Sequence, residues 1–206
     1  VTNDLGQTFD INIVENTNDV ERKYKGLNLS ASWRPTTRVT LHGVYTLSRT
    51  TNYADNDGNP RIPLFAFKEL NRGPAGYDRT HNLQTYWVWD LPLGRDRRFA
   101  AEGLADLLIG GWQVNGVMSI MSGTPIGIIQ GTGFNLNAGG SGQFPDQVKS
   151  EVAILGGVGP TNEYFDRSAY VAVNIPTGQP QRFGNSGRNP IRGPGFWNVD
   201  MGLFRT

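Results

Sequence analysis

The stretch GWQVNGVMSIMSGTP, residues 111–125, decides the fold of this chain. Apolar residues or glycine occupy every even position from Trp112 to Ile120, and Gln113, Asn115 and Ser119 stand between them. Side chains alternate between the two faces of a strand, so this pattern predicts a strand with one apolar and one polar face. Its apolar face is longer than the about five or six residues of an average strand. It approaches the about nine to eleven residues that a tilted strand needs to cross a bilayer.

The same alternation recurs along the chain. It predicts five more strands, at residues 8–14, 24–33, 39–48, 82–91 and 197–203. A tight turn at Pro35 joins the strands on either side of it, and the spacing of Leu104, Leu107 and Leu108 predicts a short helix within 99–109. Residues 50–76 and 127–190 lose the periodicity and are interpreted as long loops, with a brief β-like piece at 170–175.

The composition agrees with many strands and loops. The 206 residues include 27 Gly and 12 Pro, and only 18% are charged, which argues against a helical bundle. Cysteine is absent, so thiol catalysis, thiolate metal sites and disulfides are excluded. A net charge of +1 gives no reason to expect nucleic-acid binding. The chain starts without Met and ends inside an alternating run, so we expect it to be a piece of a longer protein.

Alternation alone does not separate a membrane barrel from a soluble β-sandwich, because both have one apolar and one polar face. The loop lengths favour the barrel, since both long loops fall at the same end of the predicted sheet, as in outer-membrane barrels. This arrangement places Trp33, Trp89 and Trp112 at one end and Trp197 at the other, as aromatic girdles would be. We therefore predict an all-β fold of antiparallel up-and-down strands, forming part of a transmembrane β-barrel with long extracellular loops. A secreted sandwich is the alternative.

Six short motifs carry a family resemblance. In order they are YDRTHN at 77–82, WDLPLG at 89–94, GGWQ at 110–113, SGTP at 122–125, FGNSGRN at 183–189 and GPGFWN at 193–198. Together they resemble the C-terminal part of the barrel in TonB-dependent outer-membrane receptors, in the class with an N-terminal carboxypeptidase-regulatory-like domain. The resemblance implies a large barrel closed by a plug, which imports a scarce ligand with energy from a TonB-type partner. Residues 1–206 are then a fragment of one barrel domain, with the plug and the remaining strands absent.

The long loops hold the candidate ligand-binding residues. Aromatic rings can stack on a sugar or chelate ring, and arginine can pair with phosphate or carboxylate on lipopolysaccharide or on an acidic ligand. The candidates are Tyr53, Arg61, Phe65, Phe67, Phe134, Phe144, Tyr164 and Arg188. Further arginines of the same loops are Arg72, Arg167, Arg182 and Arg192. In the alternative interpretation these charges are solvated and the aromatic residues pin the loops together.

No set of residues suggests catalysis, a cofactor or a metal. His42 and His81 are interpreted as polar lining, and the turn 55–59 lacks the glutamate that a calcium loop needs at its twelfth position, which is Ala66. We therefore expect a protein that is not an enzyme and that lies in the bacterial outer membrane. Two functions remain, a receptor barrel that imports a ligand, and a surface or secreted β-module that binds carbohydrate or protein without transport. The expected partners are outer-membrane lipid and lipopolysaccharide, a TonB-type partner and an unknown ligand, and not nucleic acid.

Overall fold

The computed structural model describes residues 21–55, 65–95, 97–99, 103–130, 144–174 and 182–205. The strand predicted at 8–14 lies outside these residues. The chain divides into two compact units. The sheet unit comprises Lys25–Arg49, Arg79–Gly123 and Pro194–Thr206, and the loop unit comprises Val1–Tyr24, Thr50–Asp78 and Thr124–Gly193.

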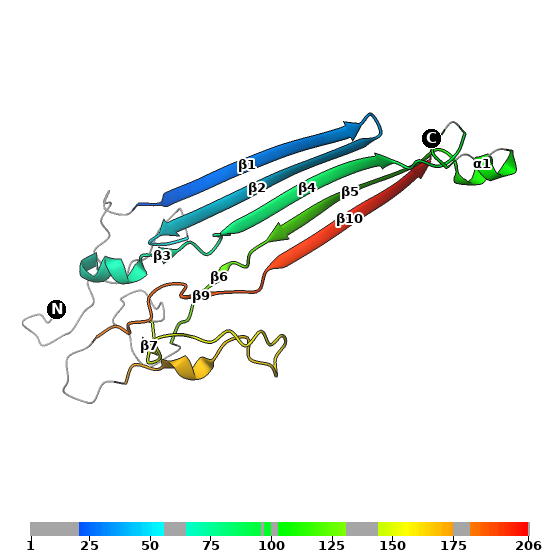
Figure 1. The fold of residues 1–206 in the computed structure, drawn as a ribbon. Helices are drawn as coiled ribbons and strands as arrows, with labels where there is room; N and C mark the ends of the chain where they lie inside the picture. Colours follow the sequence, from blue (N-terminus) through cyan, green and yellow to red (C-terminus); the bar gives the residue numbers. More distant parts are fainter. Residues whose placement is uncertain are drawn as a thin grey trace, which may run out of the picture. The chain divides into compact units, whose positions relative to one another are not determined.

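Five long strands form the main sheet. They are β1 (Lys23–Thr36), β2 (Val39–Asn52), β4 (His81–Asp90), β5 (Trp112–Met121) and β10 (Phe196–Arg205). They lie side by side in the order β1-β2-β4-β5-β10 (Figure 1). The pairs β2–β4, β4–β5 and β5–β10 are antiparallel. The predicted all-β antiparallel fold is confirmed. Among the described residues the sheet is open, with β1 and β10 as its two edges.

The strand register separates two faces. Cross-strand partners share a face, and Leu41 pairs with Trp87, Trp87 with Gly116, and Gly116 with Met201. The next row on this apolar face joins Gly43, Thr85, Met118 and Val199. The opposite, polar face carries rows such as Gln84, Ser119 and Asn198. Hydrogen bonds from Thr46 Oγ1 to Asn28 Oδ1 (2.8 Å) and between Ser32 and His42 (2.7 Å) place the even residues of β1 on the polar face. The predicted two-faced sheet is confirmed.

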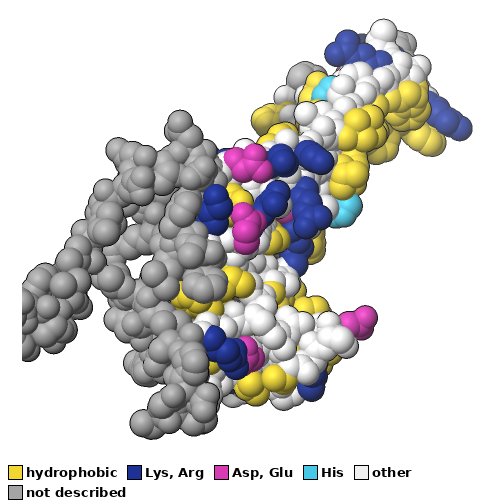
Figure 2. Space-filling view, turned by 90° about the vertical axis from the view of Figure 1, so that its left-hand side faces the viewer, with side chains coloured by type: hydrophobic (Ala, Val, Ile, Leu, Met, Phe, Trp, Pro, Cys, Tyr) yellow, Lys and Arg dark blue, Asp and Glu magenta, His cyan; other side chains and the backbone are white. Residues whose placement is uncertain are grey.

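The apolar face has no second layer over it in the part of the sheet unit that is described. Trp197 is 73% exposed and Met201 is 66% exposed, and hydrophobic side chains are visible at the surface in Figure 2. A β-sandwich would bury such a face against a second sheet. The exposure therefore argues against the sandwich alternative.

The two ends of the sheet differ in their connections. At the turn end, β1 and β2 are joined by two residues, and β4 and β5 are joined by a segment that contains α1 (Leu104–Ile109). This is the short helix expected within 99–109. Trp89 pairs with Val39 beside the turn, and Trp112 pairs with Arg205, whereas Trp197 pairs with Ile120 at the opposite, loop end. The predicted levels of these tryptophans are confirmed.

The loop unit contains short elements. Its members are η1 (Phe65–Asn71), β3 (Gly73–Pro74), β6 (Pro125–Ile126), β7 (Asp146–Gln147), η2 (Arg167–Ala169), β8 (Tyr170–Val171) and β9 (Ile191–Arg192). β3 pairs with the end of β2, β6 with β9, and β7 with β8. Residues 50–76 are thus not a plain loop, because β2 continues to Asn52 and β3 returns along it. Of the β-like piece expected at 170–175, Tyr170 and Val171 form β8, residues 172–174 are not in a strand, and residue 175 lies outside the described residues.

The loop unit also holds the buried apolar side chains of the described chain, which are Tyr53, Ala75, Ala169, Val173 and Ile191. Among the described residues, no helix is both long enough and apolar enough to cross a membrane.

A packing contact on the apolar face yields a prediction. A Cβ at Gly116 would overlap the ring of Trp87, its cross-strand partner, whereas a Cβ at Gly43 would meet Thr85 Cγ2 at an ordinary 3.5 Å. We expect Gly116→Ala to lower the free energy of unfolding by about 1–3 kcal/mol, because the indole ring must move out of its site. Gly43→Ala is the matched control, with an expected change of less than about 0.5 kcal/mol. Urea unfolding of the full-length protein measures both, and equal effects would contradict this packing.

Candidate functional site

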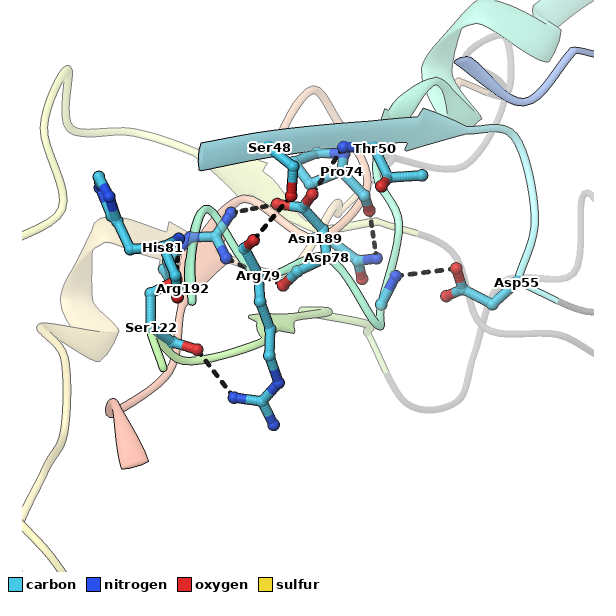
Figure 3. A network of polar contacts seen from close by, with 11 residues as sticks. Ser48, Thr50, Asp55, Pro74, Asp78, Arg79, His81, Ser122, Asn189 and Arg192 are labelled. Carbon is cyan, nitrogen blue, oxygen red and sulfur yellow. Dashed lines mark hydrogen bonds and ion pairs between the residues drawn. The ribbon is translucent and has the colours of Figure 1, made fainter. Parts of the chain in front are cut away.

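The carboxylate of Asp78 is the hub of the loop unit. Its side chain is completely buried. One oxygen accepts a hydrogen bond from the backbone N–H of Thr50 (2.6 Å), and the other pairs with Arg192 Nη2 (2.6 Å; Figure 3). Arg192 Nη1 also donates to the backbone carbonyl of Asp78 (3.0 Å). A buried carboxylate is stable only when it is paired and hydrogen-bonded, and both conditions are met here. Asp78, near the end of the β2–β4 connection, therefore joins Thr50 in β2 to Arg192 in β9.

Backbone hydrogen bonds hold Asp78 in place. The N–H of Asp78 donates to the carbonyl of Ala75 (2.8 Å), which closes the turn before it. The N–H of Ala75 donates to the carbonyl of Thr50 (3.0 Å), and Ala75 is completely buried. The Thr50 backbone is thus engaged at both its donor and its acceptor.

A second ion pair joins the same two connections. Arg188 Nη2 lies 2.5 Å from Asp55 Oδ2, and Arg188 Nη1 donates to Asn52 Oδ1 (2.6 Å). Asp55 Oδ1 accepts from the N–H of Gly76 (2.8 Å) and from Asn52 Nδ2 (3.1 Å). Partial burial raises the pKa of Asp55, but the hydrogen bonds from Gly76, Arg188 and Asn52 outweigh it and hold the pKa below its usual value. Asp55 is therefore a carboxylate at neutral pH.

The backbone around Arg188 is shaped to fit β3. A Cβ on Gly73 would overlap the carbonyl oxygen of Arg188, so only glycine permits this approach. Asn189 adopts a left-handed conformation (φ 52°), and its side-chain amide donates to the carbonyl of Pro74 (2.8 Å). The FGNSGRN motif at 183–189 therefore packs on the segment that precedes the YDRTHN motif at 77–82.

Three of the predicted ligand-binding aromatic residues make contacts within the loop unit. Tyr53 is buried and its hydroxyl donates to Glu69 (2.9 Å), which raises the pKa of Tyr53. The hydroxyl of Tyr164 donates to the carbonyl of Arg192 (3.0 Å). Phe144 is half-buried and its carbonyl packs on Gly184. These contacts correspond to the alternative in which the aromatic residues pin the loops.

The other candidates are less defined. Arg188 has the partners given above, and Phe65 and Phe67 lie in η1. Arg61 and Phe134 lie outside the described residues. Ligand contact by any of the eight candidates stays a prediction.

Other loop arginines also form internal ion pairs. Arg182 makes two parallel hydrogen bonds to Asp146 (2.8 and 2.6 Å), and the pKa of Asp146 is held below its usual value by this arginine. Arg72 lies 3.9 Å from Glu69 and 3.7 Å from Glu21. The sequence presented these arginines as solvated charges or ligand contacts and did not reveal their role as cross-links. Asp78 was also missed, because 114 residues separate it from Arg192 and only its membership of a motif marked it.

At the loop end of the sheet unit, Arg79 and Ser122 join three strands. Arg79 Nη1 donates to the carbonyl of Ser122 (2.8 Å), and the N–H of His81 donates to Ser122 Oγ (2.9 Å). Ser48 Oγ donates to the carbonyl of Arg79 (3.1 Å; Figure 3). The YDRTHN and SGTP motifs thus secure the ends of β2, β4 and β5.

The polar face of the sheet carries hydrogen-bonding side chains along its length. The rings of His42 and Tyr86 stack with centroids 5.0 Å apart, and Gln113 Nε2 donates to Asp90 (2.6 Å). His42 is polar lining, as predicted. His81 is not polar lining, because it pairs with Leu47 on the apolar face. There its Nδ1 atom and the Tyr45 hydroxyl form a hydrogen bond (2.7 Å). The interpretation of His81 rested on residue type and overlooked its odd position in the strand.

Metal binding finds no support in the described parts of the chain. No group of three or more His, Asp or Glu residues there is arranged to hold a metal ion.

A comparison with known protein families gives one match. Residues 4–206 match the model described as an outer membrane beta barrel domain. The chain belongs to this family. Comparisons with curated proteins and with solved structures gave no match.

Membership of the outer membrane β-barrel family indicates what each surface described above faces. The protein lies in the bacterial outer membrane. In such barrels the apolar face contacts lipid and the polar face lines the interior, short turns are periplasmic and long loops are extracellular. The turn end is therefore periplasmic. The β2–β4 and β5–β10 connections, which supply most of the loop unit, are extracellular.

The Asp78 hub yields a prediction for this barrel protein. Arg192→Gln leaves the buried carboxylate without its charged partner, so we expect local stability to fall by roughly 1.5–3 kcal/mol. This is less than for a fully buried pair, because the Arg192 side chain is 34% exposed. Amide hydrogen exchange at Thr50 should quicken by about tenfold or more. Arg182→Gln, which breaks the Arg182–Asp146 pair elsewhere in the same unit, is the control and should leave Thr50 exchange unchanged. Unchanged exchange in Arg192→Gln would refute the role of Asp78.

Proposed function

We propose that this chain is the barrel portion of an outer-membrane TonB-dependent receptor that imports a scarce ligand, and that it is not an enzyme. The observation that carries the proposal is the cross-linking of the two long extracellular connections by Asp78–Arg192 and Arg188–Asp55. A receptor gains affinity when its binding loops are ordered before the ligand arrives. The order of the six motifs along the chain supports the same family.

The polar face supports the transport half of the proposal. A ligand released from the loops must cross the barrel interior, where hydrogen-bonding side chains replace its water. Gln84, Asn115, Ser119 and Asn198 supply such donors and acceptors, together with the His42–Tyr86 stack. The TonB-type partner would supply energy through a plug, which is a part of the receptor separate from the strands described here.

The second candidate is a barrel that binds protein or carbohydrate at the cell surface without transport. It is favoured by a loop segment at 153–166, held by hydrogen bonds between Leu155 and Tyr164 (2.8 Å) and between Asp166 and Ala153 (2.9 Å). This segment leaves Ile154, Leu155 and Val158 exposed. Exposed apolar residues of this kind suit contact with another protein.

Liposome swelling tests the receptor proposal. The full-length protein is reconstituted into liposomes, and the liposomes are diluted into isotonic L-arabinose. A plugged receptor should give no swelling above that of empty liposomes, and removal of the N-terminal plug should make swelling rapid, because the polar interior is then open. Rapid swelling with the intact protein would identify a passive pore.

Binding to the purified periplasmic domain of a TonB-type partner separates the two candidates. The receptor should bind it, and a variant without the N-terminal region should not. If the intact protein is closed to arabinose and fails to bind the partner, the surface-module candidate replaces the receptor.

A further inference from the structure

The β4–β5 connection at the periplasmic turn end presents apolar side chains to its surroundings. Periplasmic turns are usually short, and the β1–β2 turn has two residues, but this connection extends from Leu91 to Gly111 and includes α1. Phe99, Leu104 and Leu108 are 57%, 79% and 69% exposed. Apolar side chains exposed in one place on a protein mark a contact surface.

Asp106 fixes which side of α1 is turned outward. Its carboxylate accepts a hydrogen bond from the N–H of Arg95 (2.6 Å). The same carboxylate lies so close to Gly94 and Gly110 that a Cβ on either would stand 2.7 or 2.6 Å from Asp106 Oδ1. In a helix with about 3.6 residues per turn, Asp106 lies opposite the side shared by Leu104 and Leu108. One side of α1 is therefore tied to the chain, and the apolar side faces away from it.

The helix is attached to the rim of the lipid-facing surface. Trp112 lies two residues before Val114 in β5, so its side chain is on the same, apolar face. Its indole N–H donates to the carbonyl of Leu108 (3.0 Å). The guanidinium of Arg205 lies 6.0 Å from the centre of the Trp112 ring. Figure 1 shows α1 beside the ends of β5 and β10. The exposed leucines thus continue the apolar face at the level where Trp89 and Trp112 mark the membrane interface.

The charges at this end favour an anionic surface. The turn end carries six arginines, which are Arg34, Arg38, Arg95, Arg97, Arg98 and Arg205. In the sequence, residues 90–111 contain three of these arginines and four acidic residues, Asp90, Asp96, Glu102 and Asp106, so the net charge of +2 comes from Arg34, Arg38 and Arg205. Asp90 accepts from Gln113 on the polar face, and Asp106 accepts from the Arg95 N–H. Arginine forms strong hydrogen bonds with phosphate.

We propose that the β4–β5 connection is an interfacial anchor for phospholipid of the periplasmic leaflet. Phe99, Leu104 and Leu108 insert among the lipid chains near the headgroups, and Arg97 and Arg98 meet the phosphates of anionic phospholipids. Lipid is favoured over a periplasmic protein because the leucines continue a face that already contacts lipid. The anchor holds the periplasmic rim of this part of the barrel at a set depth, as interfacial residues do for membrane helices.

A depth measurement tests the anchor. Two single-cysteine variants of the full-length protein are made, Leu104→Cys and Leu108→Cys. Each is labelled at the cysteine with an environment-sensitive fluorophore and placed in vesicles of phosphatidylcholine and phosphatidylglycerol. Thr37→Cys, in the exposed β1–β2 turn at the same end, is the matched control. Quenching is measured with iodide in the water and with spin labels at two depths in the lipid. Only protein with heat-modifiable gel mobility is measured, so that the barrel is folded.

The anchor predicts that labels at 104 and 108 are shielded from iodide and lie roughly 5–10 Å into the boundary between headgroups and chains. The label at Thr37→Cys should be open to iodide. Replacing phosphatidylglycerol by phosphatidylcholine should move the two leucine labels toward the water. If both are as open to iodide as the Thr37→Cys label, the segment stands in water, and the proposal is overturned in favour of a periplasmic protein partner.

Discussion

Register is the constraint on which the sheet depends. Because side chains alternate with a period of two, a slip of one residue between neighbouring strands moves every apolar side chain to the other face. In hydrocarbon such a slip would place glutamine and asparagine against lipid, where unsatisfied polar groups are costly. The rows Leu41–Trp87–Gly116–Met201 and Gly43–Thr85–Met118–Val199 show that four strands keep this register together. Trp87 fits over Gly116 in one of these rows, so a slip would also remove the space for its ring.

The extracellular connections solve a different problem. In their described parts the buried apolar side chains are Tyr53, Ala75, Ala169, Val173 and Ile191, which lie apart from one another in the sequence. Ion pairs between side chains also hold these connections together. Asp78 and Asp55 each accept hydrogen bonds from both an arginine and the backbone, so two acids of one connection hold two arginines of the other. Glycine at 73 and a left-handed Asn189 then allow the two chains to approach.

The sequence predicted the parts of this structure that depend on local periodicity. Alternation located β1, β2, β4, β5 and β10, assigned their faces and set the level of Trp112 against Trp197, since each of these needs only neighbouring residues. It also indicated α1 from leucine spacing. The loop contacts were beyond reach, because Asp78 and Arg192 are 114 residues apart and many loop arginines were equally plausible partners. His81 was misplaced for a simpler reason, because its polar character was given more weight than its odd position in β4, which pairs it with Leu47 on the apolar face.

The central claim is that the apolar face of this sheet contacts lipid and the polar face lines the barrel interior. Spin labels placed one at a time along β5, from Trp112 to Met121, test it directly in the full-length protein reconstituted in a bilayer. Collision with oxygen reports lipid exposure, and collision with a water-soluble nickel chelate reports exposure to water. The account predicts a period of two residues, with oxygen contact high at Val114, Met118 and Ile120 and low at Asn115 and Ser119. A profile without that period, or with the two sets exchanged, would contradict it.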